Sequence, residues 1–141
     1  MARLVLDTNS LIQCLPSRSR YHIVWNSFIE GTNILCVTNE ILEEYIEILQ
    51  KLVSVDITEN IIKTILNSPF TEFITPYYHF ELIQVDMDDN KFVDCAIASN
   101  AKCIITNDHH YDILMQIPFP KVVVKTIQEF TSELLLNRTV D

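Results

Sequence analysis

The sequence predicts an α/β fold, a three-layer α/β/α sandwich around a central, mostly parallel sheet. Short apolar runs alternate along the chain with stretches of helical periodicity, as in successive β-α-β units. The first run, residues 4–6, is apolar throughout, which is typical of a strand buried on both faces. It ends at Asp7, and polar residues able to cap a helix follow at once. The same order of apolar run, small polar residue and acid returns over residues 103–108.

The N-terminal half is expected to alternate strands with helices. In chain order the elements are a strand over 4–6, a short helix ending near Cys14, a helix over 21–29, a strand over 33–37 and helices over 40–53 and 58–67. Thr8 or Asn9 is placed to cap the first helix, and Thr38 or Asn39 the third. Gly31 follows the second helix, at the position where a left-handed residue commonly ends one.

The C-terminal half is expected to continue the alternation. It comprises an irregular connection over 71–78, a short strand over 79–85, an acidic turn over 86–90, a helix over 91–100, a strand over 103–106, a helix over 109–115, a strand over 122–125 and a closing helix over 127–136. Aspartates before a helix are usually caps, and we interpret the acidic turn in that way. No repeat, low-complexity tract or linker interrupts the pattern, so we expect one domain over residues 1–141.

Composition and charge exclude several classes of protein. No apolar run approaches the roughly 18 residues of a membrane helix, and Asp7 interrupts the first apolar stretch, so we expect a cytoplasmic protein without membrane association. With Gly31 as its only glycine, the chain lacks P-loops, dinucleotide-binding fingerprints and the G-x-S-x-G elbow. The net charge of −9 argues against a large basic surface. The four cysteines occur singly, without a C-x-x-C pair, and are expected to be reduced and buried.

Four carboxylates form a candidate site. Asp7 and Asp108 follow strands, while Glu44 and Asp94 lie near the starts of helices. In a parallel sheet all four can converge on the carboxyl edge, where ligands bind. Clustered carboxylates raise one another's pKa values and need a cation, yet the only Lys or Arg beside them is Lys91, near Asp94. Mg²⁺ or Mn²⁺ prefers such oxygen ligands. The alternative is that the strand-end acids are helix caps and the other two are solvated.

The geometry of the helix over 40–53 favours one of its glutamates. The apolar residues fill one broad arc, and Glu43 and Glu47 point away from it. Glu44 lies about 40° beyond the edge of that arc, so its side chain can lean over the buried side. We therefore choose Glu44 as the acid that this helix contributes.

These residues belong to four segments that resemble the ordered motifs of PIN-domain proteins, and more closely the toxin components of toxin–antitoxin systems. The segments are Leu4-Val5-Leu6-Asp7-Thr8-Asn9, Thr38-Asn39-Glu40-Ile41-Leu42-Glu43-Glu44-Tyr45, Asp88-Asp89-Asn90-Lys91-Phe92-Val93-Asp94-Cys95-Ala96 and Ile105-Thr106-Asn107-Asp108. Each segment alone is a weak signal. Four of them in the right order, over nearly the whole chain, make the resemblance specific.

The resemblance implies a metal-dependent endoribonuclease that uses three or four acids. Carried over by position, the catalytic and metal-binding residues are Asp7, Glu44, Asp94 and Asp108, with Asn9 and Thr106 as supporting polar residues. Glu40 and Glu43 are less favoured registers for the second acid. Asp89 is a rival of Asp94 for the third, because the acidic turn allows several registers. The cofactor is Mg²⁺ or Mn²⁺, as one ion or two.

The implied partners are an RNA substrate and a small basic antitoxin protein, and the family is compatible with a homo-oligomer. A net charge of −9 suits the docking of a cationic antitoxin segment over the carboxylates. His109 and His110, beside Asp108, have the chemistry to protonate a leaving group or ligate a transition metal. Adjacent histidines at a helix start, however, usually face different directions.

Two alternatives belong to other classes of function. One is a non-catalytic RNA-binding or scaffold module that keeps the fold, and the retention of all four acids argues against it. The other is a phosphatase of another α/β type, with Asp7 as an aspartyl nucleophile. Such an enzyme needs a D-x-D pair, whereas Asn9 stands at the second place.

Overall fold

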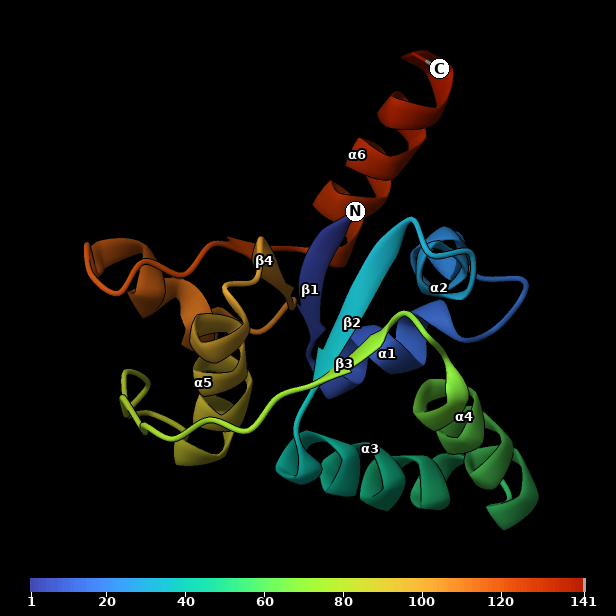
Figure 1. Cartoon of the computed structure of the whole chain (residues 1–141), viewed down its shortest axis with the longest axis horizontal. Helices are drawn as coiled ribbons and strands as arrows, with labels where there is room; N and C mark the ends of the chain where they lie inside the picture. Colours follow the sequence, from blue (N-terminus) through green and yellow to red (C-terminus); the bar gives the residue numbers. More distant parts are fainter. Residues whose placement is uncertain (141) are drawn as a thin grey trace.

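A parallel sheet with the strand order β3-β2-β1-β4-β5 lies at the centre of the molecule, for which the computed structural model describes residues 1–140 (Figure 1). The strands are β1 (Ala2–Leu6), β2 (Asn33–Val37), β3 (Thr71–Phe73), β4 (Cys103–Ile105) and β5 (Val124–Lys125). All neighbouring strands pair in parallel. Leu4, Val5 and Leu6 of β1 and every residue of β4 are shielded from solvent, which confirms that these apolar runs form strands buried on both faces.

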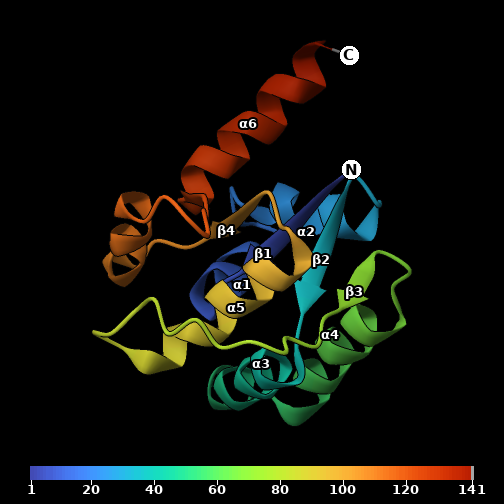
Figure 2. The ribbon, with the colours of Figure 1, turned by 60° about the vertical axis from the view of Figure 1, so that its left-hand side comes forward.

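Helices cover both faces of this sheet. They are α1 (Thr8–Cys14), α2 (His22–Ile29), α3 (Asn39–Leu52), α4 (Val55–Asn67), α5 (Asn90–Ser99) and α6 (Ile127–Val140), with the 3₁₀ helices η1 (Met87–Asp89) and η2 (His109–Gln116). Figures 1 and 2 show α5 on one face and α1 and α2 on the other. The predicted three-layer α/β/α fold with a parallel sheet is confirmed.

A change in winding direction between β1 and β4 positions the candidate site. The chain leaves β1 for β2 and β3 on one side, then crosses back to β4 and β5 on the other. Ligands in open α/β sheets bind at such a switch point, outside the carboxyl ends of the strands. Leu6 pairs with Ile105, and the Asp7 N–H donates a hydrogen bond to the Ile105 carbonyl at 3.1 Å. The residues that follow β1 and β4 therefore begin at the same level of the sheet edge.

The ends of the helices follow from local sequence. Thr38 caps α3 through its side chain, as expected. Ser54 does the same for α4, which therefore begins at Val55, earlier than residue 58. Gly31 ends α2 with φ +81°, and a Cβ atom there would lie 2.5 Å from the Phe70 ring. Both the backbone conformation and the close approach require glycine at this position.

The connecting segments differ most from expectation. The strand predicted over 79–85 is wrong, because this stretch has no regular structure and side chains of α5 bind its backbone. Residues 71–73, predicted as irregular, form the edge strand β3, which is too short to show a periodicity. The helix predicted over 109–115 is the 3₁₀ helix η2, and the strand predicted over 122–125 is reduced to β5.

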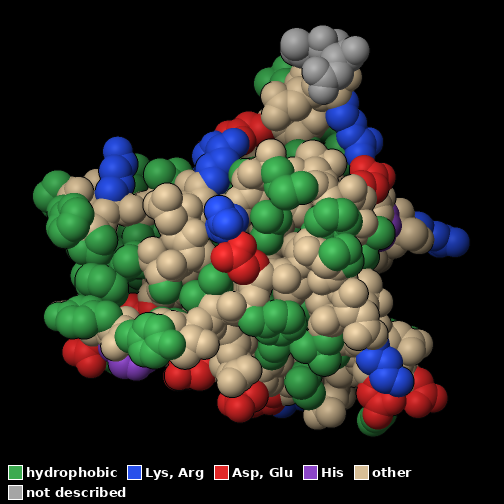
Figure 3. All heavy atoms as spheres, viewed as in Figure 1, with side chains coloured by type: hydrophobic (Ala, Val, Ile, Leu, Met, Phe, Trp, Pro, Cys, Tyr) green, Lys and Arg blue, Asp and Glu red, His purple; other side chains and the backbone are tan. Residues whose placement is uncertain are grey.

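Other expectations concern the surface and the cysteines. No helix within residues 1–140 is long and apolar enough to cross a membrane. The four cysteines are free and buried, as expected. On the face seen in Figure 3, Lys and Arg side chains are interspersed with acidic and apolar ones and form no continuous basic patch.

Candidate active site

Asp7 and Asp108 meet at the carboxyl edge of the two neighbouring strands β1 and β4. Each also caps the helix that follows it: Asp7 accepts a hydrogen bond from the Asn9 N–H at 3.3 Å, and Asp108 accepts one from the His110 N–H at 2.8 Å. Both line one crevice with Asn9, Ile12, Gln13 and Asn107. A capping role and a place in a shared crevice, which the sequence presented as alternatives, are therefore compatible in the same side chains.

Thr106 connects these two aspartates. It follows β4 directly, and its hydroxyl donates to Asp7 Oδ2 at 2.6 Å while accepting from the Asp108 N–H at 3.0 Å. Asp7 is 8% exposed, and burial raises the pKa of its carboxyl. The hydrogen bonds from Thr106 and Asn9 lower this pKa, whereas the charges of Glu44 and Asp108 raise it further. Asp7 is thus held rigidly in one orientation within a field of other carboxylates.

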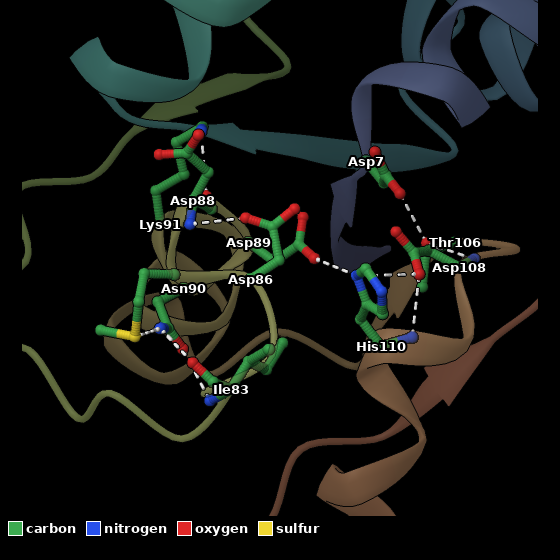
Figure 4. Close-up of polar contacts among 11 residues, drawn as sticks. Asp7, Ile83, Asp86, Asp88, Asp89, Asn90, Lys91, Thr106, Asp108 and His110 are labelled. Atoms are coloured by element: carbon green, nitrogen blue, oxygen red, sulfur yellow. Dashed lines mark hydrogen bonds and ion pairs between the residues drawn. The ribbon is translucent and has the colours of Figure 1, made fainter.

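Asp89 joins the same group from the start of α5. Its Oδ2 atom lies 3.3 Å from His110 Nδ1, which in turn lies 3.4 Å from Asp108 Oδ1 (Figure 4). Although Asp89 precedes α5, its side chain makes no cap hydrogen bond. Burial raises the pKa of Asp89 to about 6, with further increases from the charges of Asp86, Asp108 and Asp7. Ligand atoms of Asp86, Asp89 and His110 all lie within 4.8 Å of one another.

Glu44 reaches the site from α3. It accepts a hydrogen bond from the buried Thr8 hydroxyl, and its Oε1 atom lies 2.7 Å from Lys91 Nζ. Glu43 and Glu47 are exposed, which confirms the predicted orientation of the three glutamates. The expected neighbour of Lys91 was Asp94, whereas its side chain turns to Glu44. Lys91 is 12% exposed, so it is an internal cation that neutralises this glutamate.

Asp94 faces away from this cluster. It is 4% exposed and contacts the segment that crosses α5: its Oδ1 atom accepts from the Phe80 N–H at 3.1 Å, and its Oδ2 atom lies 3.2 Å from His79 Nδ1. It lines a separate groove together with Thr38, His79 and Lys91. Asp94 and Asp89 are five residues apart, about 140° around a helix, so their side chains point in different directions.

The remaining predicted residues also differ in whether their side chains contact the acids of the site. The Asn9 side chain is exposed at the mouth of the crevice and contacts Asp7 through its backbone N–H. His109 is exposed beside Asp112, whereas His110 turns toward the aspartates, so these adjacent histidines do face different directions. Thr8 or Asn9 was expected to cap α1, which is wrong because Asp7 caps it, and the contact of Thr8 with Glu44 depends on how α1 and α3 pack. Nothing in the sequence pattern indicates that contact.

The donor atoms suit a hard divalent cation. Within the described part of the chain, no Lys or Arg forms an ion pair with Asp7, Asp89 or Asp108. Burial and mutual repulsion raise the pKa values of Asp7 and Asp89, and a bound cation would relieve both effects. Carboxylate oxygens are the ligands that Mg²⁺ and Mn²⁺ prefer. The residues present therefore fit such an ion.

Comparisons with known proteins agree with this architecture. A family model described as "PIN domain" matches residues 3–110. Among solved structures, the chain is similar to the crystal structure of VapBC2 from Rickettsia felis bound to a DNA fragment from their promoter, with 16% sequence identity and a TM-score of 0.62. That similarity covers 88% of this chain and 98% of the other. No curated protein matches the chain. At this identity the structural likeness establishes the fold.

Proposed function

The chain belongs to the PIN-domain family, and from this premise we propose that it is a metal-dependent endoribonuclease acting at the β1–β4 switch point. The observation that carries the proposal is that Asp7 and Asp108 line one crevice and that His110 links Asp108 to Asp89, with no Lys or Arg paired with these aspartates among the described residues. Helix capping would account for Asp7 and Asp108 in a non-catalytic scaffold, but Asp89 makes no cap hydrogen bond, and its raised pKa costs such a scaffold stability at neutral pH. A site that binds a cation at this position would use these carboxylates as its ligands.

Mg²⁺ or Mn²⁺ would be held by carboxylate oxygens of Asp7, Asp89 and Asp108, and when bound would supply Lewis-acid activation of water and charge stabilisation at the phosphoryl group. Thr106 and the Asn9 N–H fix the two oxygens of Asp7 in place. His110 lies between Asp89 and Asp108 and holds their separation. Glu44 completes the acidic site from α3, where Thr8 orients it.

Asp89 is the better candidate than Asp94 for the third acid. The charges of Asp108 and Asp7 act on Asp89, which places it within their field. Both oxygens of Asp94 contact the 79–80 segment instead. We therefore propose that Asp94 has a structural role and that Asp89 binds the cation. The motif positions in the sequence alone favour Asp94 as the third acid.

RNA as substrate and a toxin–antitoxin context are the finer parts of the proposal. The four ordered motifs support both parts, and the structural similarity to VapBC2 supports the toxin–antitoxin context alone. With a net charge of −9, the chain relies on few basic contacts, so RNA affinity should be modest and depend on a cation bridging to phosphate. The same charge suits a small basic antitoxin as the partner.

Cleavage of a single-stranded RNA by the purified protein tests the proposal. We expect cleavage with Mn²⁺ or Mg²⁺, none with excess EDTA, and a loss of at least about 100-fold in Asp7→Asn, since even outer partners of metal ligands contribute about 10–100-fold. Glu47→Gln, at an exposed position of α3, serves as the matched charge-removal control and should retain activity. Metal-dependent cleavage retained in Asp7→Asn would exclude this site as the source of the activity.

A further inference from the structure

Both carboxylate oxygens of Glu44 have a partner within the protein. The Oε2 atom accepts a hydrogen bond from the Thr8 hydroxyl, and the Oε1 atom forms an ion pair with Lys91 Nζ at 2.7 Å. In the part of the chain that the structure describes, none of the three aspartates of the candidate site forms an ion pair with a Lys or Arg. The polypeptide therefore neutralises Glu44 itself and leaves the aspartates to a bound cation.

Hydrogen bonds on both sides of Asp7 hold Glu44 beside the candidate site. Thr8, the partner of Glu44, directly follows Asp7 in the chain. Tyr45, the neighbour of Glu44 on α3, is completely buried, and its hydroxyl donates to the Leu6 carbonyl at 2.6 Å, directly before Asp7. Because α3 is joined in this way to the end of β1, the position of Glu44 at the site follows from contacts within the protein.

The ammonium of Lys91 is also fixed by several groups. Its Nζ atom donates to the Asp88 carbonyl at 2.9 Å and lies 5.4 Å from the centroid of the Phe92 ring. Lys91 is 12% exposed, and an ammonium so withdrawn from water needs a paired acid. A divalent cation at Glu44 would have to displace this ammonium from the acid, the carbonyl and the ring together.

An exposed ion pair on α3 provides a comparison. Lys51 Nζ lies 3.6 Å from Glu47 Oε1, and both side chains are 66% exposed. A surface pair of this kind contributes little to stability. Lys91 and Glu44, by contrast, are 12% and 26% exposed and join α5 to α3. The Lys91–Glu44 pair is therefore part of the site's construction, whereas the Lys51–Glu47 pair is not.

The pairing of Glu44 limits the number of metal ions that the site can hold. In two-metal sites the ions lie about 3.5–4 Å apart and stabilise the attacking and the leaving oxygen of a displacement. A second ion here would draw on Glu44, because both oxygens of Asp94 contact the 79–80 segment. Glu44 already carries a cation, the Lys91 ammonium, and a fixed ammonium can stabilise charge at a phosphoryl group without a metal.

We propose that the Lys91 ammonium takes the place of a second divalent cation at Glu44, so that the protein binds a single divalent ion, on its aspartates. Since it concerns the ion site of the nuclease, this inference rests on the proposed function. Lys91 follows Asp89 by two residues on α5 and lines the groove that extends from the start of this helix. Its positive charge is thus fixed next to the aspartates, where it favours the phosphate of a bound RNA strand.

The number of Mn²⁺ ions bound per protein tests the inference without RNA or activity, and the resonance signal of free Mn²⁺ in an electron paramagnetic titration measures it. We expect one ion in the wild-type protein and two in Lys91→Met, which removes the charge and frees Glu44. Lys91→Met combined with Glu44→Gln should return to one ion. Lys51→Met, which breaks the exposed pair on α3, is the matched control and should bind one ion. Two ions in the wild-type protein, or one in Lys91→Met, would overturn the inference.

Anomalous diffraction from wild-type crystals at saturating MnCl₂ decides the question if a variant fails to fold. We expect one peak, with Lys91 still paired with Glu44. A second peak coordinated by Glu44 would overturn the inference and leave the nuclease proposal intact, because an ion would still lie on the aspartates. If the wild-type protein binds no Mn²⁺, the proposed function fails. In that case an ion gained in Lys91→Met and lost again with Glu44→Gln would still support the place of Lys91, and no ion in any variant would overturn both proposals.

Discussion

Individual aspartates in this protein differ in role although their sequence contexts are alike. Asp7 and Asp108 were predictable, since an acid directly after a buried parallel strand must lie at the sheet edge where ligands bind. Asp89 and Asp94 were not distinguishable, because both lie near the start of the same helix. Only their direction around α5 separates them, and which of the two faces Asp108 depends on how α5 packs against the sheet and the preceding segment. That packing is not determined by the sequence pattern.

The assignment of the third acid gives the first prediction. Asp89→Asn should reduce RNA cleavage by at least about 100-fold, because it removes a charge from the cation site. Asp94→Asn should instead lower the melting temperature, with a smaller effect on cleavage, because it weakens the contacts with His79 and Phe80. Cleavage rates and melting curves of the two variants decide between them. The opposite pattern would restore Asp94 as the third acid.

The raised pKa of Asp89 predicts a dependence of stability on pH. The carboxyl has a pKa of about 6 in the folded protein and 3.8 as its ordinary value, so between these values the folded state holds more protons than the unfolded state. The free energy of unfolding of the metal-free protein should therefore fall as pH rises from about 4 to about 6. Asp89→Asn should flatten this slope and raise the melting temperature at pH 7. If Asp89→Asn shows the same dependence of unfolding free energy on pH as the wild-type protein between about pH 4 and about pH 6, measured by urea unfolding, Asp89 does not have this raised pKa.

At the scale of elements, α5 organises the connection that precedes it. Asn90 and Asp94 lie one turn apart on one face of α5, and both bind the backbone of residues 79–83. This contact explains why the strand predicted there does not form: its backbone groups bond to side chains instead of to a neighbouring strand. The long helices were predictable because their apolar periodicity extends over several turns. A segment whose partners are side chains carries no periodicity to detect.

Removal of the Asn90 side chain tests this arrangement. Asn90 is buried, accepts from the Ile83 N–H at 2.9 Å and donates to the Ile83 carbonyl at 2.7 Å. Asn90→Ala leaves both backbone groups unsatisfied and should destabilise the protein by about 2–3 kcal/mol. Asn60→Ala, at an exposed position of α4, is the matched control and should change the free energy of unfolding by less than about 0.5 kcal/mol. Equal changes in the free energy of unfolding for Asn90→Ala and Asn60→Ala, measured by urea unfolding, would show that Asn90 does not hold residues 79–83 in place.

At the scale of the whole molecule, the strand order forms the acidic crevice, and the net charge determines what kind of partner suits it. The fold class followed from the alternation of strands and helices, but the strand order that makes β1 and β4 neighbours comes only from the structure. That order brings residues 99 positions apart, Asp7 and Thr106, into one hydrogen bond. The net charge of −9, with no continuous basic patch on the face in Figure 3, leaves the acidic crevice as the feature that a cationic partner would recognise.

Competition for this crevice gives a prediction about partners. An arginine-rich peptide, as a stand-in for a basic antitoxin segment, should bind the wild-type protein, with an affinity that falls as NaCl rises from about 50 to about 300 mM. Mg²⁺ should displace the peptide more strongly than the same ionic strength of NaCl, because the ion and the guanidinium groups compete for the same carboxylates. Fluorescence anisotropy measures both effects. Equal displacement by the two salts would place the peptide elsewhere on the acidic surface.

The position of a bound Mn²⁺ ion tests the central claim most directly. Anomalous diffraction from a crystal soaked in MnCl₂ would locate the ion without any assumption about substrate or activity. We expect a peak about 2.0–2.3 Å from a carboxylate oxygen of Asp7 and from one of Asp89 or Asp108, with Asp94 still bound to the 79–80 segment. A peak coordinated by Asp94, or soaked crystals with no peak beside Asp7, would contradict the account.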